Sequence, residues 1–260
     1  MEELSFVNYA VKDRICTITL NRPDKRNALN EQVVSELKTA FQQAATDEEA
    51  KVIVLAAKGA AFCAGADLAY LQQLQKNSFE ENLADSNHLK ELFYQIYTHP
   101  KVVIAKIQGH AIAGGCGLAT VCDFSFAVDD AQFGYTEVRI GFIPAIVKVF
   151  LLRKIGEGKA KELLLSGDLI SAQEAKTFGL INAVVLESDL DQTVYEFAKK
   201  LVEKNSAQSM QFTKQMIAHV QALSLEDGLN YAAEQNAKAR ASEDCQKGIA
   251  AFLNKEKPSW

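Results

Sequence analysis

The sequence lacks the features of a membrane-spanning protein, a secreted protein or a basic nucleic-acid binder. No apolar run approaches the roughly 18 residues needed to cross a bilayer. The first residues contain neither the basic nor the apolar segment of a signal peptide. Acidic residues outnumber basic ones by 33 to 28, and a net charge of −5 offers no overall basic surface for nucleic acid.

Cysteines are few and do not form a pattern. Their odd number excludes complete pairing, and their spacing fits neither a disulfide framework nor a metal site: Cys16, Cys63, Cys116, Cys122 and Cys245. Thiols of this kind stay reduced inside the cell. Together with the missing signal peptide, this leads us to expect a cytoplasmic protein.

Several catalytic motifs are also missing. Gly109 and Gly114 have the spacing of a phosphate-binding loop, but Gly115 and Cys116 stand where that loop needs lysine and serine or threonine. The same peptide lacks the third glycine of a dinucleotide fingerprint. The four histidines form no i, i+4 pair, and no Gly-x-Ser-x-Gly elbow occurs. We therefore expect no metal and no separate cofactor.

Two glycine-containing peptides, at 62–68 and 109–118, stand out. Each follows an apolar run that predicts a strand, at 52–55 and 102–105, and each precedes a segment that can be helical. A turn between strand and helix leaves backbone N–H groups free for a ligand. Two such turns can aim two donors at one oxygen, which is how an oxyanion hole is built. A carboxylate, Glu137, follows shortly afterwards.

Alternation of strands and helices gives way to helices along the chain. We predict a hairpin over 7–20, a helix capped by Asn30, strands at 52–57, 102–107, 124–128 and 183–185, and mostly helices from Pro144 onward. This order indicates an α/β protein with a helical C-terminal part. We expect a core over 1–195 with the site, and a helical region over 196–260 for oligomerisation.

Taken in order, the motifs resemble the enoyl-CoA hydratase/isomerase (crotonase) superfamily. They cover essentially the whole chain: NRP and KRNALN within 21–30, FCAGADL at 62–68, and the peptides at 107–123, 131–144, 172–182 and 248–255. The resemblance implies a crotonase-like spiral of ββα repeats with a C-terminal trimerisation region. It also implies a homotrimer or a homohexamer.

The resemblance assigns roles to particular residues. The backbone N–H groups of Ala66 and Gly114 would grip the thioester carbonyl of an acyl-CoA substrate, and Glu137 would be the acid and base. Coenzyme A, as part of the substrate, would contact Lys25, Arg26, Ala28, Ala64, Ala66, Asp67, Leu68 and Gly114, with Phe252 and Lys255 arriving from a neighbouring subunit. Without the resemblance, the basic residues would be read as a solvated loop. We expect Asp67 to cap a helix as well, and Asp123 to be structural.

Two departures from the family pattern bear on the substrate. Family hydratases similar to the mitochondrial short-chain enzyme carry a first glutamate where this chain has Gly117, so one glutamate remains. We expect Gly117 to leave space for a branched or carboxylated acyl group. The stretch 134–145 resembles 3-methylglutaconyl-CoA and carboxygeranoyl-CoA hydratases, which serve leucine and terpene degradation. Lys148 or Arg139 would meet the distal carboxylate of such a substrate, or lie on the surface as a solvated charge.

Three functions remain open at this point. The first is hydration of a 2-enoyl-CoA, with 3-methylglutaconyl-CoA as the expected substrate. The second is Δ3/Δ2-enoyl-CoA isomerisation, which a single glutamate permits. The third is non-catalytic binding of acyl-CoA or RNA. The presence of Glu137 and the negative net charge argue against the third.

Overall fold

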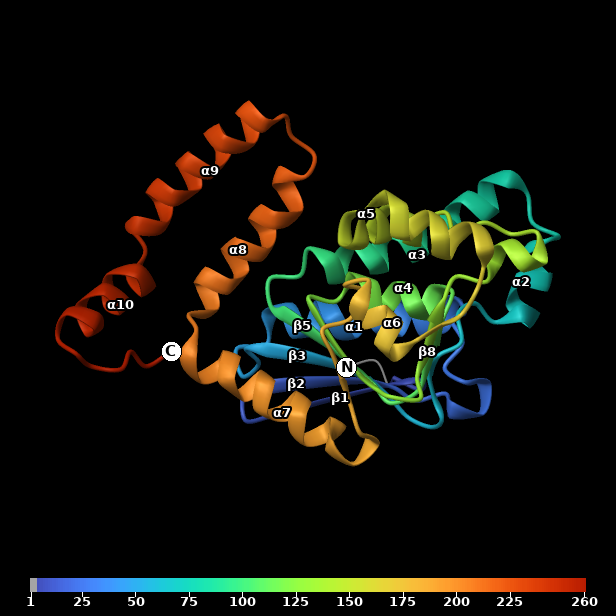
Figure 1. Ribbon diagram of the computed structural model, residues 1–260, viewed down its shortest axis with the longest axis horizontal. Helices are drawn as coiled ribbons and strands as arrows, with labels where there is room; N and C mark the ends of the chain where they lie inside the picture. The colour runs from blue at the N-terminus through green and yellow to red at the C-terminus, as the bar shows by residue number, and fades with distance from the viewer. Residues whose placement is uncertain (1–3) are drawn as a thin grey trace.

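The computed structural model describes residues 4–260. Strands and helices alternate in the first two thirds, and helices follow (Figure 1). The strands are β1 (Val7–Lys12), β2 (Ile15–Leu20), β3 (Val52–Ala57), β4 (Ala61–Cys63), β5 (Val102–Ile107), β6 (His110–Ile112), β7 (Phe124–Val128), β8 (Gln132–Gly134), β9 (Ile170–Ser171) and β10 (Ala183–Val185). The helices are η1 (Pro23–Lys25), α1 (Glu31–Thr46), α2 (Leu68–Leu74), α3 (Phe79–Tyr97), α4 (Gly114–Val121), η2 (Glu137–Ile140), α5 (Val147–Ser166), α6 (Ala172–Thr177), α7 (Glu187–Lys204), α8 (Ala207–Val220), α9 (Leu225–Arg240) and α10 (Glu243–Leu253).

A six-stranded sheet in the order β1-β2-β3-β5-β7-β10 forms the centre of the molecule. Strands β1 and β2 are the predicted antiparallel hairpin, and β2, β3, β5, β7 and β10 run parallel. Every residue of β3 is buried, because helices cover both faces of a parallel sheet. Helix α1 begins where its cap predicts, with Asn30 accepting a hydrogen bond from the Val33 amide.

A second sheet in the order β4-β6-β8-β9 lies beside the first. Three times in succession, one strand enters the first sheet and the next enters the second: β3 then β4, β5 then β6, and β7 then β8. A helix follows each of these pairs. This arrangement confirms the expected spiral of ββα repeats.

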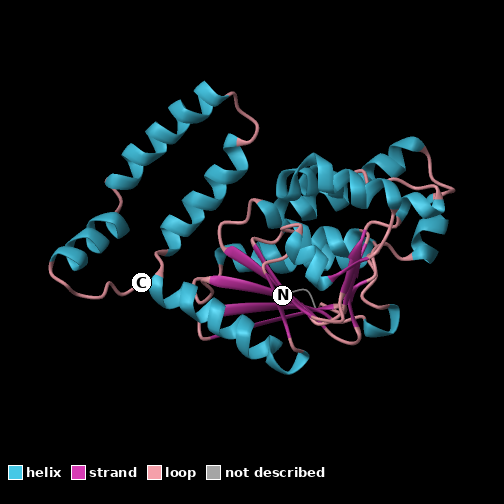
Figure 2. Ribbon diagram, in the orientation of Figure 1, coloured by secondary structure: helices cyan, strands magenta, loops and turns pink. Residues whose placement is uncertain are grey.

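The C-terminal helices α8, α9 and α10 extend away from the sheets as an arm (Figure 1). Figure 2 shows all of the drawn strands in the body and only helices and loops in the arm. Helix α9 contains no buried residue, and Ala251 is the one buried residue of α10. The arm therefore has almost no core of its own.

The boundary between body and arm lies later than we expected. Helix α7 passes through 195/196 without a break and packs on the central sheet, where Phe197 lies against Phe124 and Phe126. Leu201 and Val202 are still buried in that core. The chain leaves the body near Asn205, where α7 ends, so 187–204 belong to the body.

Within residues 4–260, no helix combines the length and the hydrophobicity that a membrane crossing requires.

Candidate active site

The first glycine turn ends strand β4 and leads into α2. Gly65 has φ +88°, which is favourable only for glycine. The turn is fixed to the loop before α1, because the Leu29 amide donates to the Gly65 carbonyl at 2.7 Å and the Asp67 amide donates to the Leu29 carbonyl at 2.8 Å. Ala66, between these two bonds, is exposed, and its amide has no hydrogen-bond partner within residues 4–260. The Ala66 N–H is therefore available to a ligand.

The second glycine turn connects β6 to α4. Ala113 adopts φ 51° and ψ −122°, a strained conformation for a residue with a side chain, and donates its amide to the Gly134 carbonyl at 2.7 Å. Gly114 then begins α4, so its N–H has no partner in the helix and lies at the positive end of the helix dipole. Ala113 was not among the predicted site residues, because a positive φ at a non-glycine residue has no reliable sequence signal.

The two turns lie against each other. A Cβ atom on Gly65 would come within 3.0 Å of the Ile112 carbonyl oxygen and 3.4 Å of the Gly114 nitrogen. A Cβ on Gly115 would lie 2.1 Å from the Cys63 carbonyl oxygen, so this position can hold only glycine. The turn that contains Ala66 therefore packs against the turn at the start of α4, and each turn holds one N–H group without a hydrogen-bond partner among the described residues.

Glu137 is the first residue of η2. It follows strand β8 of the second sheet and lies two residues after the buried Tyr135. Its carboxyl oxygen Oε2 is buried and has no hydrogen-bond partner among the described residues. Burial raises the pKa of Glu137 above its ordinary value of 4.5, and a hydrogen bond with its own backbone opposes that rise. A carboxyl group with one unpaired oxygen and a raised pKa is suited to take up and return a proton.

The loops predicted to bind coenzyme A also lie together. The Ala64 amide donates to the Arg26 carbonyl at 3.0 Å, which joins the second loop to the first. Lys25, Arg26 and Leu68 are exposed, whereas Ala28 is buried. Lysine and arginine side chains free in solvent at this edge can meet phosphates.

Asp67 has a structural task in this region. It caps α2 by accepting from the Ala69 amide and forms an ion pair with Arg22 at 2.8 Å. Burial opposes ionisation of Asp67, but its hydrogen bonds with Arg22 and backbone amides hold the pKa below its usual value. The helix cap was expected; the Arg22 partner, 45 positions away, was not.

Phe252 and Lys255 lie far from these loops in the same chain. Helix α10, which carries Phe252, is at the opposite end of the molecule from α2 (Figure 1). Phe252 is 82 % exposed. The chain alone therefore does not bring these two residues to the site.

The expected space beside Gly117 does not exist. A Cβ there would lie 2.3 Å from Val147 Cγ1 and 2.9 Å from Phe93 Cε1, so side chains of α5 and α3 already fill that volume. A branched acyl group cannot lie there. Arg139 lies on the surface, where it forms an exposed ion pair with Asp168. Lys148 is exposed and forms no ion pair within residues 4–260.

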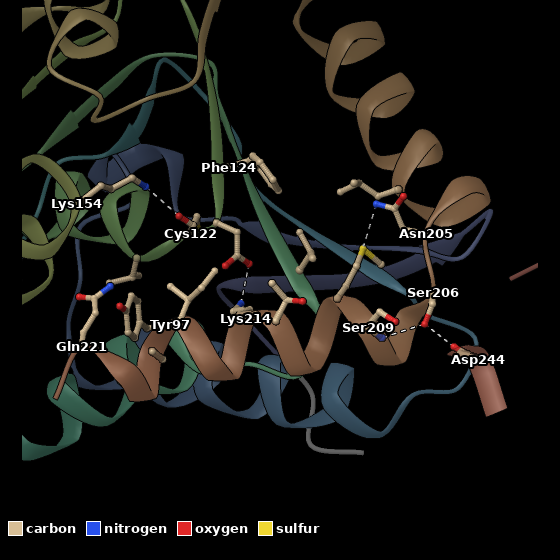
Figure 3. Close-up of a pocket in the computed structure, with 18 of the residues that line it drawn as sticks. Tyr97, Cys122, Phe124, Lys154, Asn205, Ser206, Ser209, Lys214, Gln221 and Asp244 are labelled. Carbon is tan, nitrogen blue, oxygen red and sulfur yellow. Dashed lines mark hydrogen bonds and ion pairs between the residues drawn. The ribbon is translucent and has the colours of Figure 1, made fainter. Parts of the chain in front are cut away.

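A cavity of about 820 Å³ lies elsewhere, between the arm and the body. Figure 3 shows Lys214 of α8 pointing to the body, where Nζ pairs with Asp123 at 2.7 Å. The same nitrogen donates to the carbonyls of Ile96 and Lys101. Asp123 is thus structural, as expected, and this contact anchors the start of the arm.

Comparisons with known proteins agree with this geometry. The family model described as enoyl-CoA hydratase/isomerase matches residues 10–260. The chain is 33 % identical to the 2,3-dehydroadipyl-CoA hydratase of Escherichia coli, covering 96 % of both chains. It is 31 % identical to the crotonyl-CoA hydratase of Syntrophomonas wolfei, covering 96 % of this chain and 95 % of the relative. A crystal structure of an enoyl-CoA hydratase from Shewanella pealeana superimposes with a TM-score of 0.94 at 31 % identity, covering 100 % of this chain and 97 % of that one. The protein is therefore an enzyme that belongs to the enoyl-CoA hydratase/isomerase family.

Proposed function

We propose that this enzyme adds water to the double bond of a 2-enoyl-CoA, using two backbone donors and one carboxylate. The observation that carries the proposal is the juxtaposition of the Ala66 and Gly114 turns, each with an unpaired N–H, in a structure that also holds a buried, unpartnered Glu137 oxygen. The relatives from Escherichia coli and Syntrophomonas wolfei are also named as hydratases.

The chemistry follows from these groups. Glu137 takes a proton from water as the water oxygen bonds to C3 of the enoyl thioester. The double-bond electrons move to the thioester oxygen, which becomes an enolate held by the two N–H groups; one such donor typically contributes about 3 kcal/mol. Glu137 then returns the proton to C2, and the carbonyl re-forms. A single carboxylate completes both transfers.

For the acyl group, we propose 3-methylglutaconyl-CoA or a similar branched, carboxylated enoyl-CoA. The support is the resemblance of 134–145 to hydratases of such substrates. The filled volume beside Gly117 requires the branch to lie elsewhere in the site. Lys148 is the cation that remains for the distal carboxylate, because Arg139 is paired with Asp168.

An isomerase that moves a Δ3 double bond to Δ2 is the second candidate. Glu137 as the one glutamate at a catalytic family position favours it, because moving a proton between two carbons needs only one carboxyl group. Ultraviolet absorbance separates the two functions. Hydration removes the conjugated enoyl-thioester band, whereas isomerisation of a 3-enoyl-CoA creates it. A panel of straight, branched and carboxylated acyl-CoAs then identifies the preferred substrate, and absence of both activities contradicts the proposal.

We also propose that the protein acts in the cytoplasm as a homotrimer or homohexamer. The exposed leucines of α9, Leu225 and Leu229, support a partner for the arm. In such an assembly, α10 of one subunit would bring Phe252 and Lys255 to the coenzyme A loops of the next. Light scattering that gives a monomer at micromolar concentration contradicts the proposed assembly. It leaves the proposed hydratase chemistry unaffected.

A further inference from the structure

Gly117 is the point at which three helices of the body touch. It lies one turn after Gly114 on α4, and the nearest atoms to its missing side chain belong to Val147 of α5 and Phe93 of α3. Phe93 is fully buried and Val147 is 5 % exposed. Phe93 also stacks on Phe150, one turn after Val147, with ring centroids 6.3 Å apart. This contact is dry and closely packed.

The same contact connects the two halves of the proposed chemistry. Helix α4 begins with the Gly114 donor, and α5 follows the segment that begins with Glu137. That segment is short and internally bonded, because the Phe142 amide donates to the Glu137 carbonyl at 3.0 Å and the Lys148 amide donates to the Pro144 carbonyl at 3.2 Å. These local bonds make the segment between Glu137 and the first turn of α5 a compact connection.

We propose that Val147 and Gly117 form a positioning pair that sets the distance between Glu137 and the Gly114 N–H. The inference rests on the proposed function of this site and goes beyond it by naming what holds the carboxylate in place. Val147 inserts into the notch that the missing side chain of Gly117 leaves on α4. Packed interiors transmit such changes in volume, and a misplacement of about 1 Å costs up to 10²-fold in rate.

The test compares four proteins: Gly117→Ala, Val147→Ala, the double variant, and Gly117→Ala combined with Val149→Ala. Val149 is the control, because it lies two residues along the same helix but is 43 % exposed. The reaction measured is exchange of the α-hydrogen of butyryl-CoA with deuterium oxide. In it, Glu137 removes the α-proton, the C–H electrons form the enolate, and a deuteron returns to the carbon.

Gly117→Ala is expected to lower kcat for exchange at least tenfold, with KM changed less than twofold, because the coenzyme A loops are not involved. The double variant is expected to recover kcat to within about threefold of wild type, since loss of Val147 Cγ1 removes the shortest contact of the added methyl and leaves only smaller adjustments at Phe93 Cε1, 2.9 Å away, and at the retained Cβ of residue 147, 3.2 Å away. The combination of Gly117→Ala with Val149→Ala is expected to keep the low kcat of Gly117→Ala. An unchanged kcat for Gly117→Ala, or equal rescue by Val149→Ala, overturns the proposal.

Thermal unfolding separates positioning from simple packing. If the double variant regains its midpoint temperature but not kcat, the pair is structural only and the proposal is wrong. Exchange without hydration of any enoyl-CoA would contradict the proposed hydratase function and leave the positioning pair intact. A wild-type protein that catalyses no exchange overturns both.

Discussion

The body and the arm of this protein are built in opposite ways. In the body, all six residues of β3 are buried, and the strands contribute to one continuous apolar core. In the arm, α9 buries nothing, and Leu225 and Leu229 are 82 % and 63 % exposed. The body can fold on its own contacts, whereas the arm has amphipathic helices with little to pack against. This difference supports our proposal that the body carries the chemistry and that the arm associates with another subunit.

The largest effect is expected from a substitution of Glu137, which tests whether the chemistry depends on the body alone. Glu137→Gln is expected to reduce kcat by about 10²–10⁴-fold, because the amide is nearly isosteric but cannot accept the proton. Affinity for acyl-CoA and the oligomeric mass should stay the same. Steady-state kinetics with isothermal titration of a non-reactive acyl-CoA measures both. A variant that keeps more than about a tenth of wild-type kcat shows that another residue carries the chemistry.

A pair of matched glycine substitutions compares the two regions directly. Gly115→Ala in the body places a methyl 2.1 Å from a backbone oxygen and is expected to destabilise the fold by about 3 kcal/mol. Gly228→Ala in α9 meets open space and is expected to stabilise its helix by about 0.5–1 kcal/mol. Urea unfolding gives both values. Similar effects at the two sites would mean that the arm is as tightly packed as the body.

The exposed leucines test the role of the arm. Leu225→Ser with Leu229→Ser is expected to reduce the proposed assembly in multiples of three to a single chain of 28.6 kDa, because each leucine that the assembly would bury contributes about 2 kcal/mol to association. Light scattering reports the mass. The control replaces the neighbouring residues Glu226 and Asn230 with serine and should leave the mass unchanged. An unchanged mass for the leucine variant shows that α9 is not the interface.

The smallest expected effect is the dependence of stability on pH. The pKa of Glu137 is raised in the folded protein, so between 4.5 and that raised value the folded state binds more protons than the unfolded state. Stability due to this group therefore falls as pH rises through that window. Glutamine does not ionise, so the Glu137→Gln variant does not lose this part of its unfolding free energy as pH rises. The variant should therefore be more stable than wild type at neutral pH, with little difference at pH 4. Thermal melts at both pH values measure it, and a variant less stable than wild type at neutral pH contradicts the sign.

Local signals predicted most of the fold. The caps Asn30 and Asp67 act within three residues of their partners, and the apolar runs that form β3 and β5 are evident from their composition. The two glycine turns that hold the proposed oxyanion-hole donors also follow from short motifs. These features depend on neighbours in the chain, which is why a sequence alone carries them.

The errors concern contacts between distant residues. Val147 fills the space at Gly117 from 30 positions away, and Asp168 pairs with Arg139, one of the two cations that we considered for the distal carboxylate of the substrate. The end of the body at Asn205 depends on how far α7 packs along the sheet. None of these contacts has a periodic or motif signature, because each depends on the path of the whole chain.

The central claim is that Ala66 and Gly114 together hold the thioester oxygen. Infrared spectroscopy of an enoyl-CoA labelled with carbon-13 at the carbonyl, bound to the Glu137→Gln variant, tests it most directly. Two N–H donors and the α4 dipole polarise the carbonyl, so its stretching frequency should fall clearly below the value in water. A bound carbonyl that absorbs at the frequency of the free substrate would contradict the claim.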